Sequence, residues 1–143
     1  MLDGLSPLLG PDLLATLCRM GHGDEIVLAD AHFPGESLGP PVIRMDGITI
    51  PALLDAVLPV FPLDGYVDAP LAMMDVVPGD TADPAVERSY REAVDRHRPG
   101  GHAIEKVERF AFYERAKGAF AVVMTGDVQK YANLVLKKGL CNL

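Results

Sequence analysis

A histidine and an aspartate stand at the two ends of a short apolar run near the N-terminus. His22 lies between Gly21 and Gly23, and residues 25–29 (Glu-Ile-Val-Leu-Ala) lead directly into Asp30. An imidazole titrates near neutral pH, and flanking glycines let the backbone approach a ligand closely. A carboxylate can orient an imidazole or accept a hydrogen bond from a ligand hydroxyl. This pattern indicates a site for proton transfer.

The same residues allow two other interpretations. His22, Asp30 and His32 could serve as ligands of zinc or iron, although no histidine pair has the i, i+4 spacing of a helical metal site. Alternatively, His22 belongs to an exposed turn after a helix, and Asp30 simply ends its strand by bonding to the following loop. We expect no metal, because orienting an imidazole is the more economical role for Asp30.

A second group of polar side chains lies in the C-terminal half. Arg109 begins the run 109–115 (Arg-Phe-Ala-Phe-Tyr-Glu-Arg), and Tyr131, Ala132 and Asn133 follow a turn that contains glycine. Tyrosine and asparagine offer uncharged donors and acceptors that suit a polyhydroxylated ligand, and Arg109 could donate to the same hydroxyls. The competing interpretations are a surface salt bridge for Arg109 and a tyrosine packed on the core for Tyr131.

Helical and strand patterns alternate along the chain and predict the elements that would position these residues. Proline near the start and glycine or proline after the end predict helices over residues 11–20, 51–58 and 83–98, and a fourth helix is predicted over residues 110–117, ended by Gly118. Apolar runs predict strands at 25–29, 42–44, 71–74, 104–107, 120–124 and 133–137. This alternation predicts a single three-layer α/β/α domain over residues 1–143, with a mixed, largely parallel central sheet. Ligands bind beyond the carboxyl ends of such strands, which indicates Asp30, Asp75 and residues 125–131 as pocket-lining positions.

The composition is that of an acidic globular chain. It has 13 Lys+Arg against 20 Asp+Glu, a net charge of −7, and no basic run longer than Lys137-Lys138, so we expect no nucleic-acid partner. No apolar run reaches the roughly 20 residues that cross a bilayer, so we expect no membrane partner. Cys18, on the apolar side of the first helix, and Cys141 are expected to be free thiols of a cytoplasmic protein.

Taken in order, several segments resemble the RbsD/FucU sugar mutarotase family, and within it the L-fucose mutarotase branch. The matching segments are residues 20–25, 30–34, 39–44, 73–74, 79–81, 109–115 and 131–139. They cover essentially the whole chain, and the run that begins at Arg109 is similar to the fucose branch rather than to the ribose pyranase branch.

The resemblance implies interconversion of the α and β anomers of a free sugar through its open-chain aldehyde, without a metal or organic cofactor. It also implies that His22 is the proton donor and that Asp30, Arg109 and residues 131–133 bind the sugar. Fucose-type members usually have glycine where this chain has Ala132, so we expect the methyl group to alter the fit if that backbone approaches the sugar. The family further implies a ring-shaped homo-oligomer, commonly a decamer, with pockets near subunit contacts.

These inferences combine into the hypothesis of a cofactor-free mutarotase acting on L-fucose or a closely related aldose. His22 and Tyr131 exchange protons with the sugar, and which is the acid and which the base stays open. Asp30 either orients the imidazole or binds a hydroxyl, while Arg109 and Asn133 hold further hydroxyls.

Two further expectations accompany this hypothesis. Apolar rims near Phe33 and Phe112 are expected to contact the carbon face of the sugar. The alternative function is a non-catalytic monosaccharide-binding protein, which would use the same pocket but would not need a titrating histidine.

Overall fold

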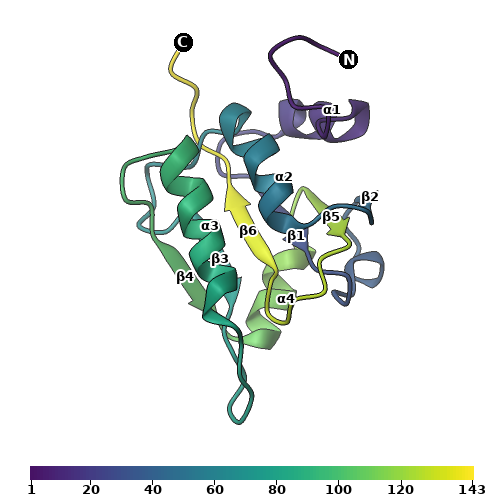
Figure 1. Ribbon diagram of the computed structural model, residues 1–143, viewed down its shortest axis with the longest axis vertical. Helices are drawn as coiled ribbons and strands as arrows, with labels where there is room; N and C mark the ends of the chain where they lie inside the picture. The colour runs from purple at the N-terminus through teal and green to yellow at the C-terminus, as the bar shows by residue number, and fades with distance from the viewer.

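A sheet of six short strands forms the centre of the protein (Figure 1). The computed structural model describes residues 1–143. The strands are β1 (Glu25–Ala29), β2 (Val42–Met45), β3 (Leu71–Met74), β4 (Ile104–Val107), β5 (Ala121–Thr125) and β6 (Leu134–Lys137). The helices are α1 (Pro11–Arg19), α2 (Ile50–Val57), α3 (Pro84–His97) and α4 (Arg109–Lys117), with short 3₁₀ turns η1 (Gly35–Ser37) and η2 (Leu58–Val60).

The observed elements agree closely with those predicted from the sequence. β1, β3 and β4 have the predicted bounds, and every other predicted element begins and ends within one residue of its prediction. Two small shifts concern the candidate site. Arg109 belongs to the first turn of α4, and Asn133 precedes β6 instead of beginning it.

The strand order is β2-β5-β1-β6-β3-β4, and only β6 runs against its neighbours. The prediction of a mixed, largely parallel sheet is therefore confirmed. The carboxyl ends of β1 and β3 lie at one edge of the sheet, and antiparallel β6 begins at that same edge. Since Leu28 pairs with Leu134, Asp30 after β1 and Asn133 before β6 necessarily lie close together.

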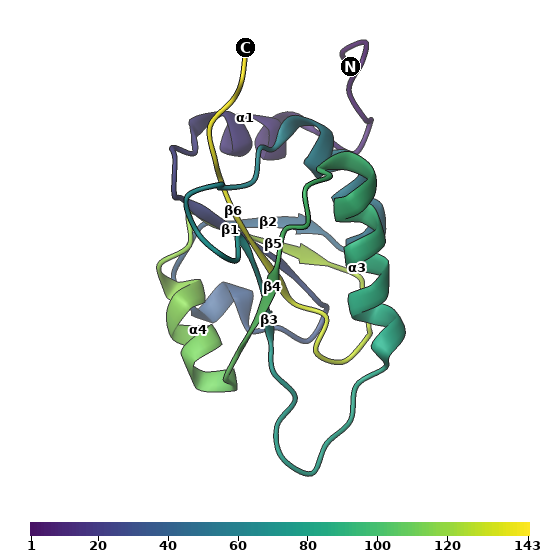
Figure 2. The ribbon, with the colours of Figure 1, turned by 90° about the vertical axis from the view of Figure 1, so that its left-hand side faces the viewer.

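Helices cover both faces of the sheet, as predicted. α2 and α3 lie on one face and α4 on the other, while α1 lies at the end of the molecule that carries both termini (Figure 2). A cluster of 24 buried residues fills the α2/α3 face, and a smaller cluster of 10 fills the α4 face. Burial of these apolar side chains is the main stabilising force, at about 1.5–3 kcal/mol for each large one.

Local sequence explains where α3 and α4 begin. The Asp83 carboxylate accepts a hydrogen bond from the Ala85 N–H at 2.9 Å, and Pro84 occupies the first turn of α3. Glu108 caps α4 by accepting from the N–H groups of Phe110 and Ala111, each at 3.0 Å. Such caps satisfy donors that a helix leaves free at its start, so the α4 cap fixes Arg109, the first residue of that helix.

One prediction about α1 is wrong. Cys18 is exposed, because Leu13 and Leu17 occupy the buried face of the helix. Cys18 and Cys141 are both free thiols. None of the helices combines the length and the apolar character needed to cross a membrane.

Candidate functional site

A pocket of about 320 Å³ lies beyond the carboxyl ends of β1 and β3, between the start of α4 and the turn that precedes β6. Its lining residues are Asp30, His32, Phe33, Met74, Val77, Asp80, Arg109, Tyr113, Lys130, Tyr131 and Asn133. The structure thus brings together the four side chains expected to act on the sugar from the C-terminal group and from the end of β1: Asp30, Arg109, Tyr131 and Asn133. Asp75 and Thr125, which the strand-end rule also indicated, do not line the pocket.

Asp30 and Asn133 form the buried floor of this pocket. The Asp30 N–H donates to Oδ1 of Asn133 at 2.8 Å, and Oδ1 of Asp30 accepts from the His32 N–H at 2.9 Å. Because a backbone N–H can only donate, the Asn133 amide must turn its oxygen toward Asp30, which leaves its NH₂ group for another partner. Burial raises the pKa of the Asp30 carboxyl above its ordinary value. The floor therefore offers a carboxylate acceptor beside an amide donor.

Tyr131 lies at the rim of the pocket in an unusual backbone conformation. Its φ of +55° is the only positive φ of a non-glycine residue in the chain. A large side chain adopts this left-handed region at a cost, and such residues cluster at functional sites. The phenol of Tyr131 donates to Oδ2 of Asp80 at 2.7 Å, and Lys130 pairs with the other oxygen of the same carboxylate at 2.5 Å.

Arg109 and an aromatic wall complete the pocket. Nε of Arg109 donates to the Tyr113 hydroxyl at 3.3 Å, so the exposed guanidinium is held by the next turn of α4. Phe33 lines the pocket as expected, but the expectation for Phe112 is wrong. Phe112 is fully buried and packs edge-on beneath Phe33, with ring centroids 5.9 Å apart. Its role is therefore to support the wall and not to contact a ligand.

Ala132 lies between two pocket residues but contributes no side chain to the pocket. It is fully buried in the core cluster of the α2/α3 face, and its carbonyl accepts from the Tyr90 hydroxyl at 2.6 Å. The extra methyl group therefore packs into the core and does not narrow the pocket. Burial raises the pKa of Asp30, and the hydrogen bond from the Ala132 backbone N–H lowers it by a smaller amount.

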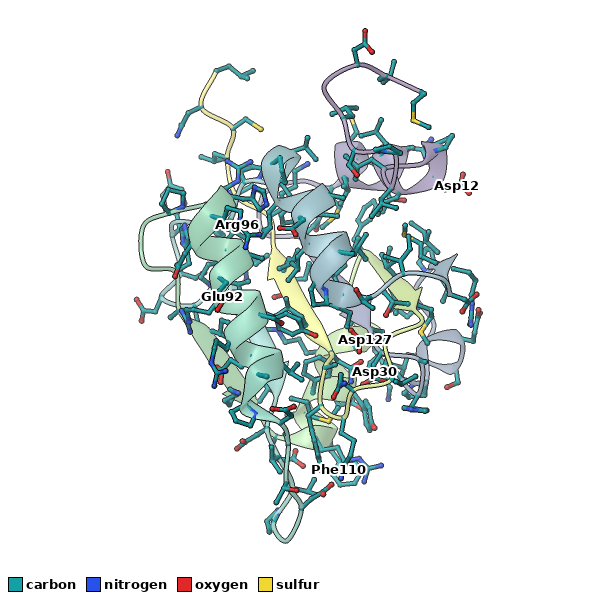
Figure 3. All side chains as sticks on the ribbon, viewed as in Figure 1. Asp12, Asp30, Glu92, Arg96, Phe110 and Asp127 are labelled. Atoms are coloured by element: carbon teal, nitrogen blue, oxygen red, sulfur yellow. The ribbon has the colours of Figure 1, made fainter.

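Thr125 and Asp127 have structural contacts that explain their burial. The Thr125 hydroxyl donates to the Ala29 carbonyl at 2.7 Å, and Oδ2 of Asp127 accepts from the Ile50 N–H at the start of α2. Figure 3 shows Asp30 and Asp127 side by side at this edge of the sheet, with Phe110 further out on α4. Their two segments are joined by a hydrogen bond from the Ala31 N–H to the Asp127 carbonyl. Asp127 thus anchors the wall of the site to α2.

Within one chain, His22 is remote from this pocket. It precedes β1, whereas Asp30 follows it, and the five residues of β1 alone span about 17 Å. Figures 1 and 2 place α1, which leads to His22, and the β3–α3 loop, which carries Asp80, at opposite ends of the molecule. Within a chain, Asp30 therefore does not orient the imidazole and Tyr131 does not face it.

The partner of His22 in its own chain is Asp64, a residue that the sequence analysis did not single out. Nε2 of His22 lies 3.0 Å from Oδ1 of Asp64, whose side chain is only 3% exposed. The Tyr66 N–H and then the His22 ring hold the pKa of Asp64 below its ordinary value. The imidazole itself is 40% exposed and lies against the Tyr66 ring, with centroids 5.2 Å apart. Asp64 and Tyr66 thus fix the orientation of the imidazole, while part of the ring stays accessible to solvent.

The alternative metal site is not assembled within the chain. Asp30 and His32 are neighbours, but His22 lies at the other end of β1. No cluster of three His, Cys, Asp or Glu side chains has the geometry of a metal site. His32 instead lines the pocket that contains Asp30 and Asn133.

Sequence reasoning missed Asp80 as a pocket residue, whereas Lys130 lies within residues 125–131, which the strand-end rule indicated. Asp80 belongs to the segment 79–81 that contributes to the family resemblance, but its type and spacing alone gave it no role. Its contact with Tyr131 joins residues 51 positions apart, which no local pattern predicts.

A pocket lined by two carboxylates, an amide, two phenols and two cationic side chains beside the Phe33 ring is a small-molecule site of the kind that binds polyhydroxylated ligands. Comparison with known families agrees with this. The RbsD / FucU transport protein family matches residues 4–141, and the chain belongs to that family.

Individual relatives are similar over nearly their full length. An L-fucose mutarotase of Actinobacillus pleuropneumoniae is 53% identical over 140 residues, covering 98% of this chain and 97% of that protein. An L-fucose mutarotase of Glaesserella parasuis is 55% identical over 98% of this chain and 96% of its own length. A fucose mutarotase of Streptococcus pneumoniae, solved in complex with L-fucose, is 46% identical with a TM-score of 0.93, covering 99% of this chain and 100% of that one.

Proposed function

We propose that this protein is an L-fucose mutarotase, an isomerase that interconverts the α and β anomers of the free sugar. The observation that carries the proposal is the identity of 53–55% to L-fucose mutarotases over 98% of the chain. The pocket supports it independently, because Asp30, Arg109, Tyr131 and Asn133 together present donors and acceptors to a ligand of monosaccharide size.

The reaction requires two proton movements and no net change in the sugar's composition. One group takes the proton of the anomeric hydroxyl as the ring opens, and another gives a proton to the ring oxygen. Closing the ring on the other face of the aldehyde gives the second anomer. Positioned acids and bases each contribute roughly 10²–10⁴-fold, which is enough to accelerate a reaction that already proceeds in water.

We assign binding to Asp30, Arg109 and Asn133, with the Ala132 backbone holding Asp30. We assign proton transfer to Tyr131 and His22. Because Tyr131 and His22 lie far apart within one chain, we infer that the His22 side chain reaches the pocket from a second copy of the protein. Its exposure supports this, as does Tyr66 beside it, which is 78% exposed.

The assembly that follows is a homo-oligomer, and the decamer implied by the family resemblance is the size we propose. A closed symmetric ring would place the His22 end of one copy against the pocket end of the next at every interface. We further propose that the protein acts in the cytoplasm, a reducing compartment in which its two exposed cysteines stay unpaired thiols. The proposed proton transfers use side chains alone, so we propose that the reaction needs no cofactor.

Saturation-transfer NMR tests the function by measuring exchange between the two anomers of L-fucose. We expect the wild type to exchange them much faster than buffer, and faster than it exchanges D-ribose, D-galactose or D-glucose. His22→Ala should slow exchange about a hundredfold or more. His102→Ala, which removes a histidine on the loop before β4, is the matched control and should match the wild type.

Two outcomes would reject parts of this proposal. Equal rates for wild type and His22→Ala would remove His22 from the mechanism. Fucose binding without any exchange in the wild type would reject the enzyme and identify a non-catalytic monosaccharide-binding protein, which the absence of His22 from the pocket of a single chain would then explain.

A further inference from the structure

We propose that Asp80 is a positioning residue for Tyr131: its carboxylate holds the phenolic proton and so turns a lone pair of Oη toward the sugar. This inference rests on the proposed mutarotase function and deepens it. It assigns Tyr131 to the proton-accepting half of the reaction, an assignment that the sequence left open.

The contact itself is the first observation. Oη of Tyr131 lies 2.7 Å from Oδ2 of Asp80, and a carboxylate can only accept, so the phenol must donate. Oδ1 of Asp80 accepts from Lys130 at 2.5 Å and from the Thr81 N–H at 2.8 Å. Each oxygen of Asp80 therefore has a defined partner, and the carboxylate cannot rotate freely away from Tyr131.

The loop that carries Asp80 is shaped to present it. The segment between β3 and α3 extends beyond the edge of the sheet (Figure 2). It turns at Gly79, whose φ of +88° favours glycine, and the Asp80 N–H donates to the Val77 carbonyl at 3.1 Å. Val77 and Asp80 both line the pocket, so the loop forms one wall of it and directs Asp80 to Tyr131.

The hydrogen-bonding capacity of Tyr131 gives the direction of proton flow. A phenol has one proton and two lone pairs, and here the proton is committed to Asp80. Toward the sugar, Oη can therefore only accept. A charge-assisted hydrogen bond on its far side makes it a stronger acceptor, because linked hydrogen bonds polarise one another.

The resulting step balances. The anomeric O–H bond breaks and its proton passes to Oη, while the proton that Oη held passes to Asp80. Lys130 and then Tyr131 lower the pKa of that carboxyl to about 2, so Asp80 holds the proton only until the ring closes. The electron pair of that bond forms the aldehyde C=O as the bond between C1 and the ring oxygen breaks, and the ring oxygen takes a proton from His22. Ring closure reverses each transfer, so Asp80 and Tyr131 return to their starting states.

Charged groups around Tyr131 act on its proton in opposite directions. Asp80 raises the pKa of Tyr131 above its ordinary value, whereas Lys130 and the Val77 backbone lower it. Arg109 faces the same phenol across the pocket, and Asp30 and His32 line the pocket floor. Removing Asp80 should therefore lower the pKa of Tyr131, and removing Lys130 should raise it.

The test is Asp80→Asn, which keeps an oxygen that accepts from the phenol but cannot take a proton. We expect fucose anomer exchange to fall about a hundredfold or more, with fucose affinity unchanged within about threefold. The Tyr131 pKa, read by ultraviolet difference titration against Tyr131→Phe, should fall. Asp75→Asn makes the same change in the same loop, outside the pocket, and should alter neither readout.

Several results would overturn the proposal. Exchange by Asp80→Asn at the wild-type rate would do so, and so would a loss of exchange without a change in the Tyr131 pKa. A Tyr131 pKa at or below the ordinary tyrosine value in the wild type would by itself overturn the proposal. The pKa titration of Tyr131 does not depend on catalysis. An absence of anomer exchange in the wild type would therefore reject the mutarotase function, while the titration would still test the Asp80–Tyr131 contact.

Discussion

Asp30 shows at the scale of one residue how function and stability oppose each other. The residue is only 5% exposed on the pocket floor, and burial raises the pKa of its carboxyl above the ordinary value. A carboxyl with a raised pKa in the folded protein stabilises the fold most when it is protonated. That contribution is lost as the pH rises through the folded pKa, so ionised Asp30 costs stability at neutral pH.

Asp30→Asn should therefore raise the melting temperature at neutral pH and weaken fucose binding. The amide can still accept from the His32 N–H, but it carries no charge to bury. The gain should disappear at acidic pH, where wild-type Asp30 is itself neutral. Thermal unfolding at both pH values and calorimetric fucose titration measure the two effects, and a lower melting temperature at neutral pH would contradict the account.

At the scale of elements, α4 is held in place at both ends. Its first turn carries Arg109 into the pocket, and its last turn carries Arg115, which pairs with Glu25 at the start of β1 and with Glu105 in β4. The Arg115 and Glu25 side chains are only 24% and 16% exposed, so solvent screens this pair less than a surface pair. The ion pair thus fixes α4 against the sheet.

Arg115→Met should lower the free energy of unfolding by about 1–2 kcal/mol, between the values typical of surface and buried pairs. Lys117→Met removes the exposed ion pair between Lys117 and Glu114 on the same helix. This variant should change the free energy of unfolding by less than about 0.5 kcal/mol. Chemical denaturation of both variants measures the difference. Equal effects would show that the pair with Glu25 does not anchor α4.

Most of the elements could be predicted from the sequence, but their order in the sheet could not. Runs such as residues 26–29 and 71–74 are apolar throughout and bounded by polar or turn residues, so the strand bounds follow from local chemistry. The antiparallel course of β6 between β1 and β3 depends on pairing between distant segments, which periodicity does not encode. The same limit hid Asp64 and Asp80, whose contacts to His22 and Tyr131 span 42 and 51 residues.

At the scale of the whole molecule, the pocket and the histidine occupy opposite ends of the sheet. The sequence identified His22, Asp30 and Tyr131 as chemically suited to one reaction, but it could not show that β1 keeps His22 apart from the other two. One chain therefore contains every group that the reaction needs without bringing them together. Two copies, packed end to end, would do so.

Mixing two inactive variants tests this most directly. His22→Ala and Tyr131→Phe subunits, each alone nearly without anomer exchange, are unfolded together and refolded into mixed oligomers. If each pocket combines Tyr131 of one copy with His22 of another, about a quarter of the mixed pockets hold both native residues. We predict that exchange of L-fucose anomers recovers to about a quarter of the wild-type rate, and a mixture no more active than its separate components would contradict the shared site.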